Sequence, residues 1–182
     1  MRPTCVTVGP RLLLAGALLL GAVGARAQTA KGGKIDPTWL RADATSKTVE
    51  FKLVAGLTDA NGGMNFNGFG RGGLVLTVPQ GWTVVLHYKN EDPNLPHSVE
   101  VIPEAAALPT GPVPPAFEQA ASGRLEQGFS TGQGADVRFA PGKAGLFLLF
   151  CAVPGHGAAG MWIRLVVSEA VDKPAVATVG ER

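Results

Sequence analysis

The segment from Cys151 to Met161 contains a thiol, an imidazole and a thioether at equal spacing. Four residues separate Cys151 from His156, and four more separate His156 from Met161. A second imidazole, that of His97, lies upstream. Two histidine nitrogens and one cysteine sulfur in a plane, with a weak axial methionine sulfur, form a copper site suited to electron transfer. These four side chains are therefore the candidate metal ligands.

Each of these residues has a structural alternative when it is taken alone. A lone cysteine is more often a buried small hydrophobe than a ligand, and a lone methionine is more often core filler. The joint spacing of all four residues favours ligation over chance placement. The third histidine, His87, lies in a strand-like run in opposite phase to Leu86 and Tyr88. We expect His87 to be a partly exposed structural residue.

The elements that must position these residues are β-strands rather than helices. Short apolar or alternating runs occur between turns rich in glycine and proline, which favours a sandwich or a barrel. The expected strands are residues 49–53, 74–78, 82–88, 98–102, 135–139, 146–150 and 162–168. Gln80 and Gly81 join the second run to the third, which predicts a hairpin.

The candidate ligands lie at the ends of these expected strands. Cys151 directly follows the apolar run 146–150, Met161 precedes the run 162–168, and His156 lies in the loop between them. His97 belongs to a different connection, so a folded sandwich must bring the ligands together.

Two further segments are expected to lie outside the sandwich. Residues 104–128 are rich in alanine and proline, which predicts a surface excursion with a short helix at 116–122. The tail from Glu169 is expected to be frayed. The tryptophans are assigned to packing in the core or at its rim, and they are Trp39, Trp82 and Trp162.

Residues 1–27 have the features of a secretory signal peptide. An apolar run at 12–23 follows Arg2 and Arg11 and precedes Ala25-Arg26-Ala27, whose small residues suit a cleavage site before Gln28. The run is shorter than the ~20 residues that span a bilayer, so a retained membrane anchor is the less favoured alternative. We predict a periplasmic or otherwise extracytoplasmic protein with no stable membrane span in the mature chain.

Removal of this leader changes the cysteine count and the charge. Cys5 leaves with the leader, so Cys151 is the one thiol of the mature chain, and metal ligation explains a lone thiol in an exported protein. The leader holds three of the 16 basic residues and none of the 14 acidic ones, so the remainder carries a charge of about −1. We predict no nucleic-acid partner, because the sequence has no basic run. The remaining length suits one domain.

The ligand spacing resembles that of a known family. Cys-x4-His-x4-Met after an apolar strand, with an upstream Pro-His, is similar to the cupredoxins. Within them, the loop with Pro154-Gly155-His156 is similar to that of sulfocyanin and rusticyanin. A second match, Met64-Asn65-Phe66-Asn67-Gly68, resembles the signature of sulfocyanins that is rich in asparagine and phenylalanine. The resemblance covers residues 48–168.

This resemblance implies a cupredoxin-like Greek-key β-sandwich of about seven to eight strands, with one loop or short-helix excursion. It also implies one mononuclear copper ion, with His97, Cys151 and His156 as equatorial ligands and Met161 as the axial ligand. Ser98 occupies a position that is often asparagine in cupredoxins, and its hydroxyl is a candidate to bridge the two ligand segments. The predicted division is 1–27 signal peptide, 28–47 N-terminal segment, 48–168 copper-binding domain and 169–182 tail.

The preferred functional hypothesis is an exported type 1 copper protein that carries single electrons between respiratory partners. Each electron would enter and leave through the edge of His156. The expected partners are redox proteins such as a c-type cytochrome or a terminal oxidase, and the expected state is a monomer. Burial and a weakly donating Met161 predict a fairly high reduction potential. A protein that stores or delivers copper is the alternative. An enzyme is disfavoured, because only His87 remains for a second copper site.

Overall fold

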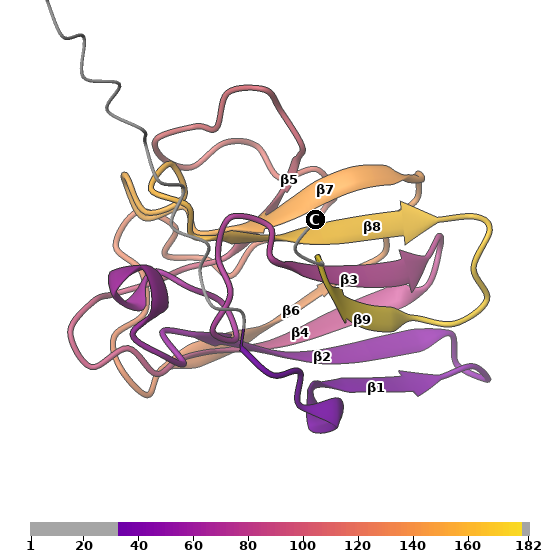
Figure 1. Ribbon diagram of the computed structural model, residues 1–182. Helices are drawn as coiled ribbons and strands as arrows, with labels where there is room; N and C mark the ends of the chain where they lie inside the picture. Colours follow the sequence, from indigo (N-terminus) through magenta and orange to yellow (C-terminus); the bar gives the residue numbers. More distant parts are fainter. Residues whose placement is uncertain (1–32, 180–182) are drawn as a thin grey trace, which may run out of the picture.

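Two β-sheets pack face to face in the computed structural model (Figure 1). The structure describes residues 33–179, and the predicted signal peptide lies outside them. Within this range there are nine strands and two short 3-10 turns, η1 (Pro37–Trp39) and η2 (Ala60–Gly63). The predicted all-β sandwich is confirmed, with one or two strands more than expected in the described part of the chain.

The first sheet has the strand order β1-β2-β4-β6. Its strands are β1 (Leu40–Asp43), β2 (Thr48–Ala55), β4 (Thr83–Asn90) and β6 (Gly134–Phe139). The second sheet has the order β5-β7-β8-β3-β9. Its strands are β3 (Leu74–Pro79), β5 (Glu100–Pro103), β7 (Gly145–Phe150), β8 (Trp162–Ser168) and β9 (Ala175–Thr178). The pairs β2 with β4 and β3 with β8 are parallel, and the other pairs are antiparallel.

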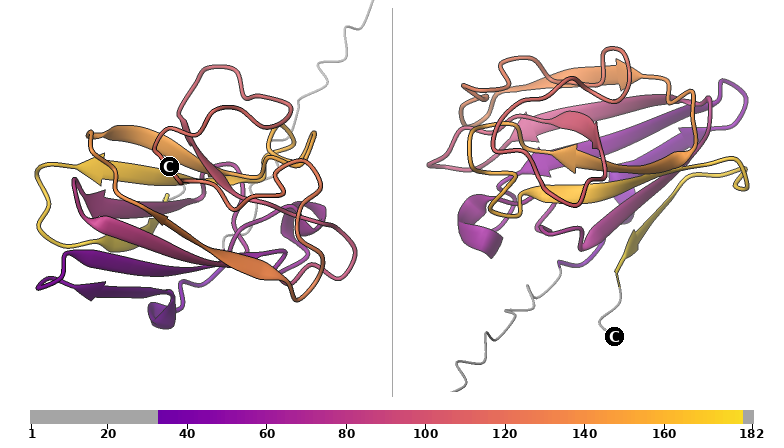
Figure 2. Two further views of the ribbon diagram at one scale, coloured as in Figure 1. Left: turned by 180° about the vertical axis from the view of Figure 1, so that it is seen from behind. Right: turned by 90° about the horizontal axis from the view of Figure 1, so that it is seen from above.

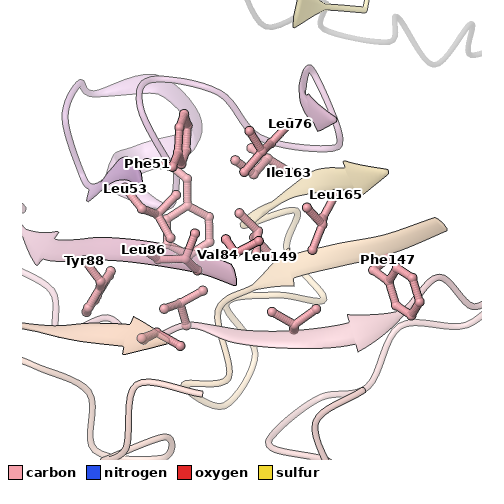
Figure 3. Close-up of a cluster of buried hydrophobic side chains, with 14 of the residues drawn as sticks. Phe51, Leu53, Leu76, Val84, Leu86, Tyr88, Phe147, Leu149, Ile163 and Leu165 are labelled. Atoms are coloured by element: carbon pink, nitrogen blue, oxygen red, sulfur yellow. The ribbon is translucent and has the colours of Figure 1, made fainter. Parts of the chain in front are cut away.

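The core lies between the sheets and follows the alternation of the sequence. In β2, Phe51 and Leu53 are fully buried while Lys52 between them is exposed. Figure 3 shows these side chains meeting others from the facing sheet, such as Leu149 and Ile163. Complete burial of a side chain of this size contributes about 1.5–3 kcal/mol. These buried contacts hold the two sheets together, and the loops that carry the predicted ligands leave from the ends of their strands.

β3 and β4 do not form the predicted hairpin. β3 pairs with β8 and β9 in the second sheet, whereas β4 pairs with β2 and β6 in the first. The connecting turn bonds to β8 and to the β6–β7 connection: Gln80 N–H donates to the Ser168 carbonyl (2.9 Å), and Gly81 N–H donates to the Pro141 carbonyl (3.0 Å). Alternation in a strand specifies which face is buried but not which strand is its partner.

The excursion at 104–128 contains no helix, so the helix predicted at 116–122 is wrong. Its backbone pairs with β5 instead: Ala116 N–H donates to the Val101 carbonyl (2.8 Å), and Val101 N–H donates to the Ala120 carbonyl (2.9 Å). The backbone groups of the excursion therefore bond to the free edge of β5 and not to one another, as they would in a helix. Figure 2 shows this segment beside β5 and β7 from two further directions.

The tail after Glu169 is also more ordered than predicted. Residues 175–178 form β9, which pairs antiparallel with β3 along its whole length. β9 covers an edge that β3 would otherwise leave with free N–H and carbonyl groups. Within residues 33–179, no helix has the length and the apolar character needed to cross a membrane.

Candidate metal centre

The backbone draws the predicted ligands together at one end of the sandwich. Cys151 directly follows β7 and Met161 directly precedes β8, and these two strands are antiparallel neighbours. Cys151 N–H donates to the Met161 carbonyl, and Met161 N–H donates to the His156 carbonyl, both at 3.0 Å. His97 arrives on the connection between β4 and β5, where it exchanges two backbone hydrogen bonds with Phe129 (3.2 and 2.7 Å).

Three donor atoms converge on one point. The Nδ1 atoms of His97 and His156 are 3.2 Å apart, and the Cys151 Sγ lies 3.9 Å from the first and 3.8 Å from the second. A point equidistant from the three atoms lies about 2.1 Å from each, close to the ~2.0–2.1 Å and ~2.3 Å bonds that histidine and cysteine make with zinc, another first-row metal. The donor set therefore fits a first-row ion in its plane.

The backbone of Met161 lies beside the three convergent donors. Met161 is fully buried, and its two backbone hydrogen bonds join it to Cys151 and His156. An axial role for the thioether sulfur remains a prediction.

Burial shapes the protonation of the three convergent donors. It raises the pKa of the Cys151 thiol to about 11, against hydrogen bonds from Ser98 and Val153 that lower it. It lowers the pKa of His97, against the raising effect of Asp92, and it lowers the pKa of His156 together with the nearby His97. Neutral imidazoles are the form that binds a metal, and a bound cation deprotonates a coordinating thiol.

Asp92 holds His97 from the far side, and the sequence reasoning missed it. Its Oδ2 lies 2.9 Å from Nε2 of His97, and both side chains are buried, with exposed fractions of 2% and 0%. Because a carboxylate only accepts, Nε2 must donate, which leaves the lone pair of Nδ1 directed at the other donors. Two acidic residues, Glu91 and Asp92, precede His97 in the sequence, and nothing in the sequence favours one over the other.

Ser98 directly follows His97 on the connection between β4 and β5. Its hydroxyl donates to the Leu125 carbonyl at 2.9 Å, and Ser98 also lowers the pKa of Cys151 by hydrogen bonding. Ser98 thus joins the His97 segment to the excursion and to the cysteine. Its influence on the metal remains a prediction.

The predicted sulfocyanin-like signature at 64–68 packs against β2, and the segment after it contacts the loop that carries His156. Phe66 is fully buried, and the Asn67 side chain bonds to the backbone of β2 at both Lys52 and Val54 (2.9 Å each). The segment that follows reaches the ligand loop, because Arg71 N–H donates to the Gly160 carbonyl at 2.8 Å. Its guanidinium also donates to the Ala159 carbonyl at 3.0 Å.

The remaining histidine lies apart from the convergent donors. His87 is exposed on β4, and its Nδ1 lies 2.9 Å from Oδ1 of Asp136 on β6. This agrees with the structural role expected for it. His156, by contrast, is half-buried at the surface between exposed Pro154 and Ala158.

Comparison with known proteins adds independent information. A family model described as the sulfocyanin (SoxE) domain matches residues 36–178. The sulfocyanin of Sulfolobus acidocaldarius is 30% identical over 143 residues, which cover 72% of this chain and 69% of that protein.

Solved structures of rusticyanin and auracyanin are also similar to this chain. A methionine-to-glutamine mutant of rusticyanin is 21% identical with a TM-score of 0.51, covering 76% of this chain and 88% of that chain. Auracyanin A of Chloroflexus aurantiacus, described as a blue copper protein, is 21% identical with a TM-score of 0.48, covering 66% of this chain and 99% of that chain. At this identity, the likeness to rusticyanin supports the fold.

Proposed function

We propose an electron-transfer function for this chain, which belongs to the sulfocyanin family. This family consists of cupredoxin-like blue copper proteins, which typically carry electrons, and the predicted copper cofactor is confirmed. The finer proposal is that the protein relays single electrons between respiratory redox partners outside the cytoplasm. A c-type cytochrome or a terminal oxidase is the proposed kind of partner, and the proposed state is a monomer.

The proposed ligands are Nδ1 of His97, Sγ of Cys151 and Nδ1 of His156 in the plane, with the sulfur of Met161 as the axial donor. The observation that carries this proposal is the mutual spacing of the three planar donors, 3.2 to 3.9 Å. Copper supplies the redox couple, since soft sulfur suits Cu(I) and imidazole accepts both oxidation states. Three strong donors and one weak donor require little rearrangement when the charge changes.

The chain contributes rigidity and exclusion of water. Three of the proposed ligands are fully buried, and only His156 reaches the surface among the four. The electron therefore enters and leaves through the imidazole edge of His156. The exposed residues beside it, such as Pro154, Gly155 and Ala158, are small and uncharged. A surface of this kind suits the small interfaces of brief electron-transfer encounters.

No enzymatic activity is proposed. A catalytic copper centre would need further histidines, and His87 is paired with Asp136 on the surface of the first sheet. In the described part of the chain, the other two histidines belong to the convergent donor set.

The test begins with the purified protein loaded with copper. We expect one copper per chain and an intense thiolate-to-copper band in the red region. Cys151→Ser should abolish this band because it removes the thiolate, whereas Ser98→Ala keeps every proposed ligand and should retain it. A band that survives Cys151→Ser would refute the ligand assignment.

A second measurement separates a relay from a storage protein. The reduced protein is mixed with an oxidised c-type cytochrome and, separately, with a Cu(I) chelator. A relay exchanges electrons rapidly and keeps its copper through many cycles. Rapid loss of copper to the chelator with slow electron exchange would favour the storage alternative.

Export is proposed from the leader features of residues 1–27, which lie outside the described residues. We propose cleavage before Gln28 and a periplasmic or otherwise extracytoplasmic location. The proposed copper-binding domain is 48–168, with β1 and β9 adding strands on either side of these bounds. The intact mass of the protein from the periplasmic fraction tests the leader, because retention of residues 1–27 would contradict cleavage.

A further inference from the structure

We propose that Asp92 is a positioning residue that lowers the reduction potential of the copper held by His97. The inference rests on the proposed function and deepens it. Asp92 would set the reduction potential of the copper without binding it.

The carboxylate of Asp92 is held on both of its oxygens. Oδ2 accepts from Nε2 of His97 at 2.9 Å, while Oδ1 accepts from the backbone N–H groups of Asn94 (2.8 Å) and Leu95 (3.0 Å). Three donors to one buried carboxylate favour its ionised form.

The surrounding backbone fixes this carboxylate in place. The Asn90 side chain accepts from Asp92 N–H at 2.9 Å, and the Thr131 hydroxyl donates to the Asp92 carbonyl. Gly56 and Gly63 lie so close to the Asp92 side chain that a Cβ at either position would overlap it. Both glycines have positive φ (+65° and +87°), so the turn closes over the carboxylate only with glycine there.

This arrangement has a direct consequence for the ion. A carboxylate that accepts from the outer nitrogen of a ligand histidine fixes the ring orientation and makes the ligand more basic. A fixed negative charge behind His97, with little water around it, also favours the more highly charged Cu(II) over Cu(I). Asp92 therefore opposes the effects of burial and of the weak axial thioether, which favour Cu(I).

Asp92→Asn tests the charge with little change of shape. Asparagine has nearly the same volume and still offers a carbonyl oxygen to Nε2 of His97, but it carries no charge, and its amide nitrogen replaces the Oδ1 that accepts from Asn94 and Leu95. We expect the affinity for Cu(II) to fall about 10–100-fold, the usual effect of removing such a partner. The affinity for Cu(I) should change less, and each tenfold difference raises the midpoint potential by ~59 mV for one electron. The blue band should persist.

Asp59→Asn is the matched control. Asp59 is an exposed acid that lines the same surface hollow as Asp92, a cavity of about 460 Å³, whereas the side-chain partners of His97 are Asp92, Cys151 and His156. This variant removes one charge nearby, and its potential should stay close to that of the wild type because exposed charges are screened. Equal shifts in both variants would overturn the specific role of Asp92, as would an unchanged or lowered potential in Asp92→Asn.

A measurement on the wild type keeps the inference testable if the variant fails to fold. In the Cu(I) form, nuclear magnetic resonance should show the Nε2 proton of His97 protected from exchange with water, and that of His156 exchanging rapidly. Absence of a protected imidazole proton would overturn the inference. Absence of the thiolate band in the wild type would instead contradict the proposed function itself.

Discussion

Glu100 predicts an unusual pH dependence of stability. This residue is fully buried in β5, where it pairs with Phe150 of β7 beneath the excursion. Its Oε1 accepts from Val113 N–H at 3.2 Å, and its Oε2 has no hydrogen-bond partner among the described residues. Burial therefore raises the pKa of Glu100 from 4.5 to about 6. We consider the replacement of this carboxyl by the neutral amide in Glu100→Gln.

The sign and size of the effect follow from this shift. Between pH 4.5 and 6 the folded chain binds more protons at Glu100 than the unfolded chain does, so the free energy of unfolding falls as pH rises. A shift from 4.5 to about 6 corresponds to a loss of about 2 kcal/mol at pH 7 at about 1.4 kcal/mol per pKa unit. The contribution of Glu100 to instability is absent below pH 4.5 and complete above pH 7.

Denaturant unfolding of the wild type and of Glu100→Gln at several pH values measures this effect, with the same copper content in both. Any cost of burying the amide is independent of pH, so it cancels in the pH profile of the difference. We expect the variant to gain about 2 kcal/mol relative to the wild type between pH 4 and 7. Glu118→Gln, which changes an exposed glutamate of the same excursion, should show a flat difference. A flat difference for Glu100→Gln would refute the reasoning.

Two further predictions concern the ligand loop. Met161→Gln should keep copper and colour but lower the midpoint potential, because a harder axial donor favours Cu(II); voltammetry showing an unchanged or raised value would count against the axial role. Gly157→Ala should destabilise the protein by about 1–3 kcal/mol, because the new Cβ would overlap the Phe150 ring. Gly155→Ala meets no neighbour but has a φ of +84°, so denaturation of this variant isolates backbone strain from overlap.

The candidate ligands were predictable for two reasons. Cysteine, histidine and methionine are few in this sequence, and three of the four candidates lie close together in it. Cys151, His156 and Met161 fall within one loop, so no knowledge of sheet topology was needed to join them. The central strands were equally accessible, since β2 and β8 alternate cleanly between buried and less buried residues.

Strand pairing and edge strands were less predictable. β1 has one half-buried residue followed by three exposed ones, so it lacks the alternation that marks a strand. The runs that became β3 and β4 are close in sequence, but each finds its partners elsewhere. Local sequence favours a turn between them without specifying that the turn crosses from one sheet to the other.

Asp92 shows a different limit. It is one of 14 acidic residues, and its role depends on a turn that points its carboxylate at Nε2 of His97. Neither its spacing nor its type distinguishes it from an exposed acid such as Glu91 beside it. Only the folded geometry, with Gly63 packed against the carboxylate, identifies it.

X-ray absorption at the copper edge reports the atoms bound to the ion, so it measures the proposed ligand set itself. We expect two imidazole nitrogens at about 2.0 Å and one sulfur at about 2.2–2.3 Å in the wild type, typical of first-row metal bonds to these donors. The short sulfur contribution of the thiolate should disappear in Cys151→Ser, where the weak axial thioether of Met161 is the remaining sulfur. A wild-type spectrum with only nitrogen and oxygen neighbours would contradict the convergence of His97, Cys151 and His156 on one copper ion.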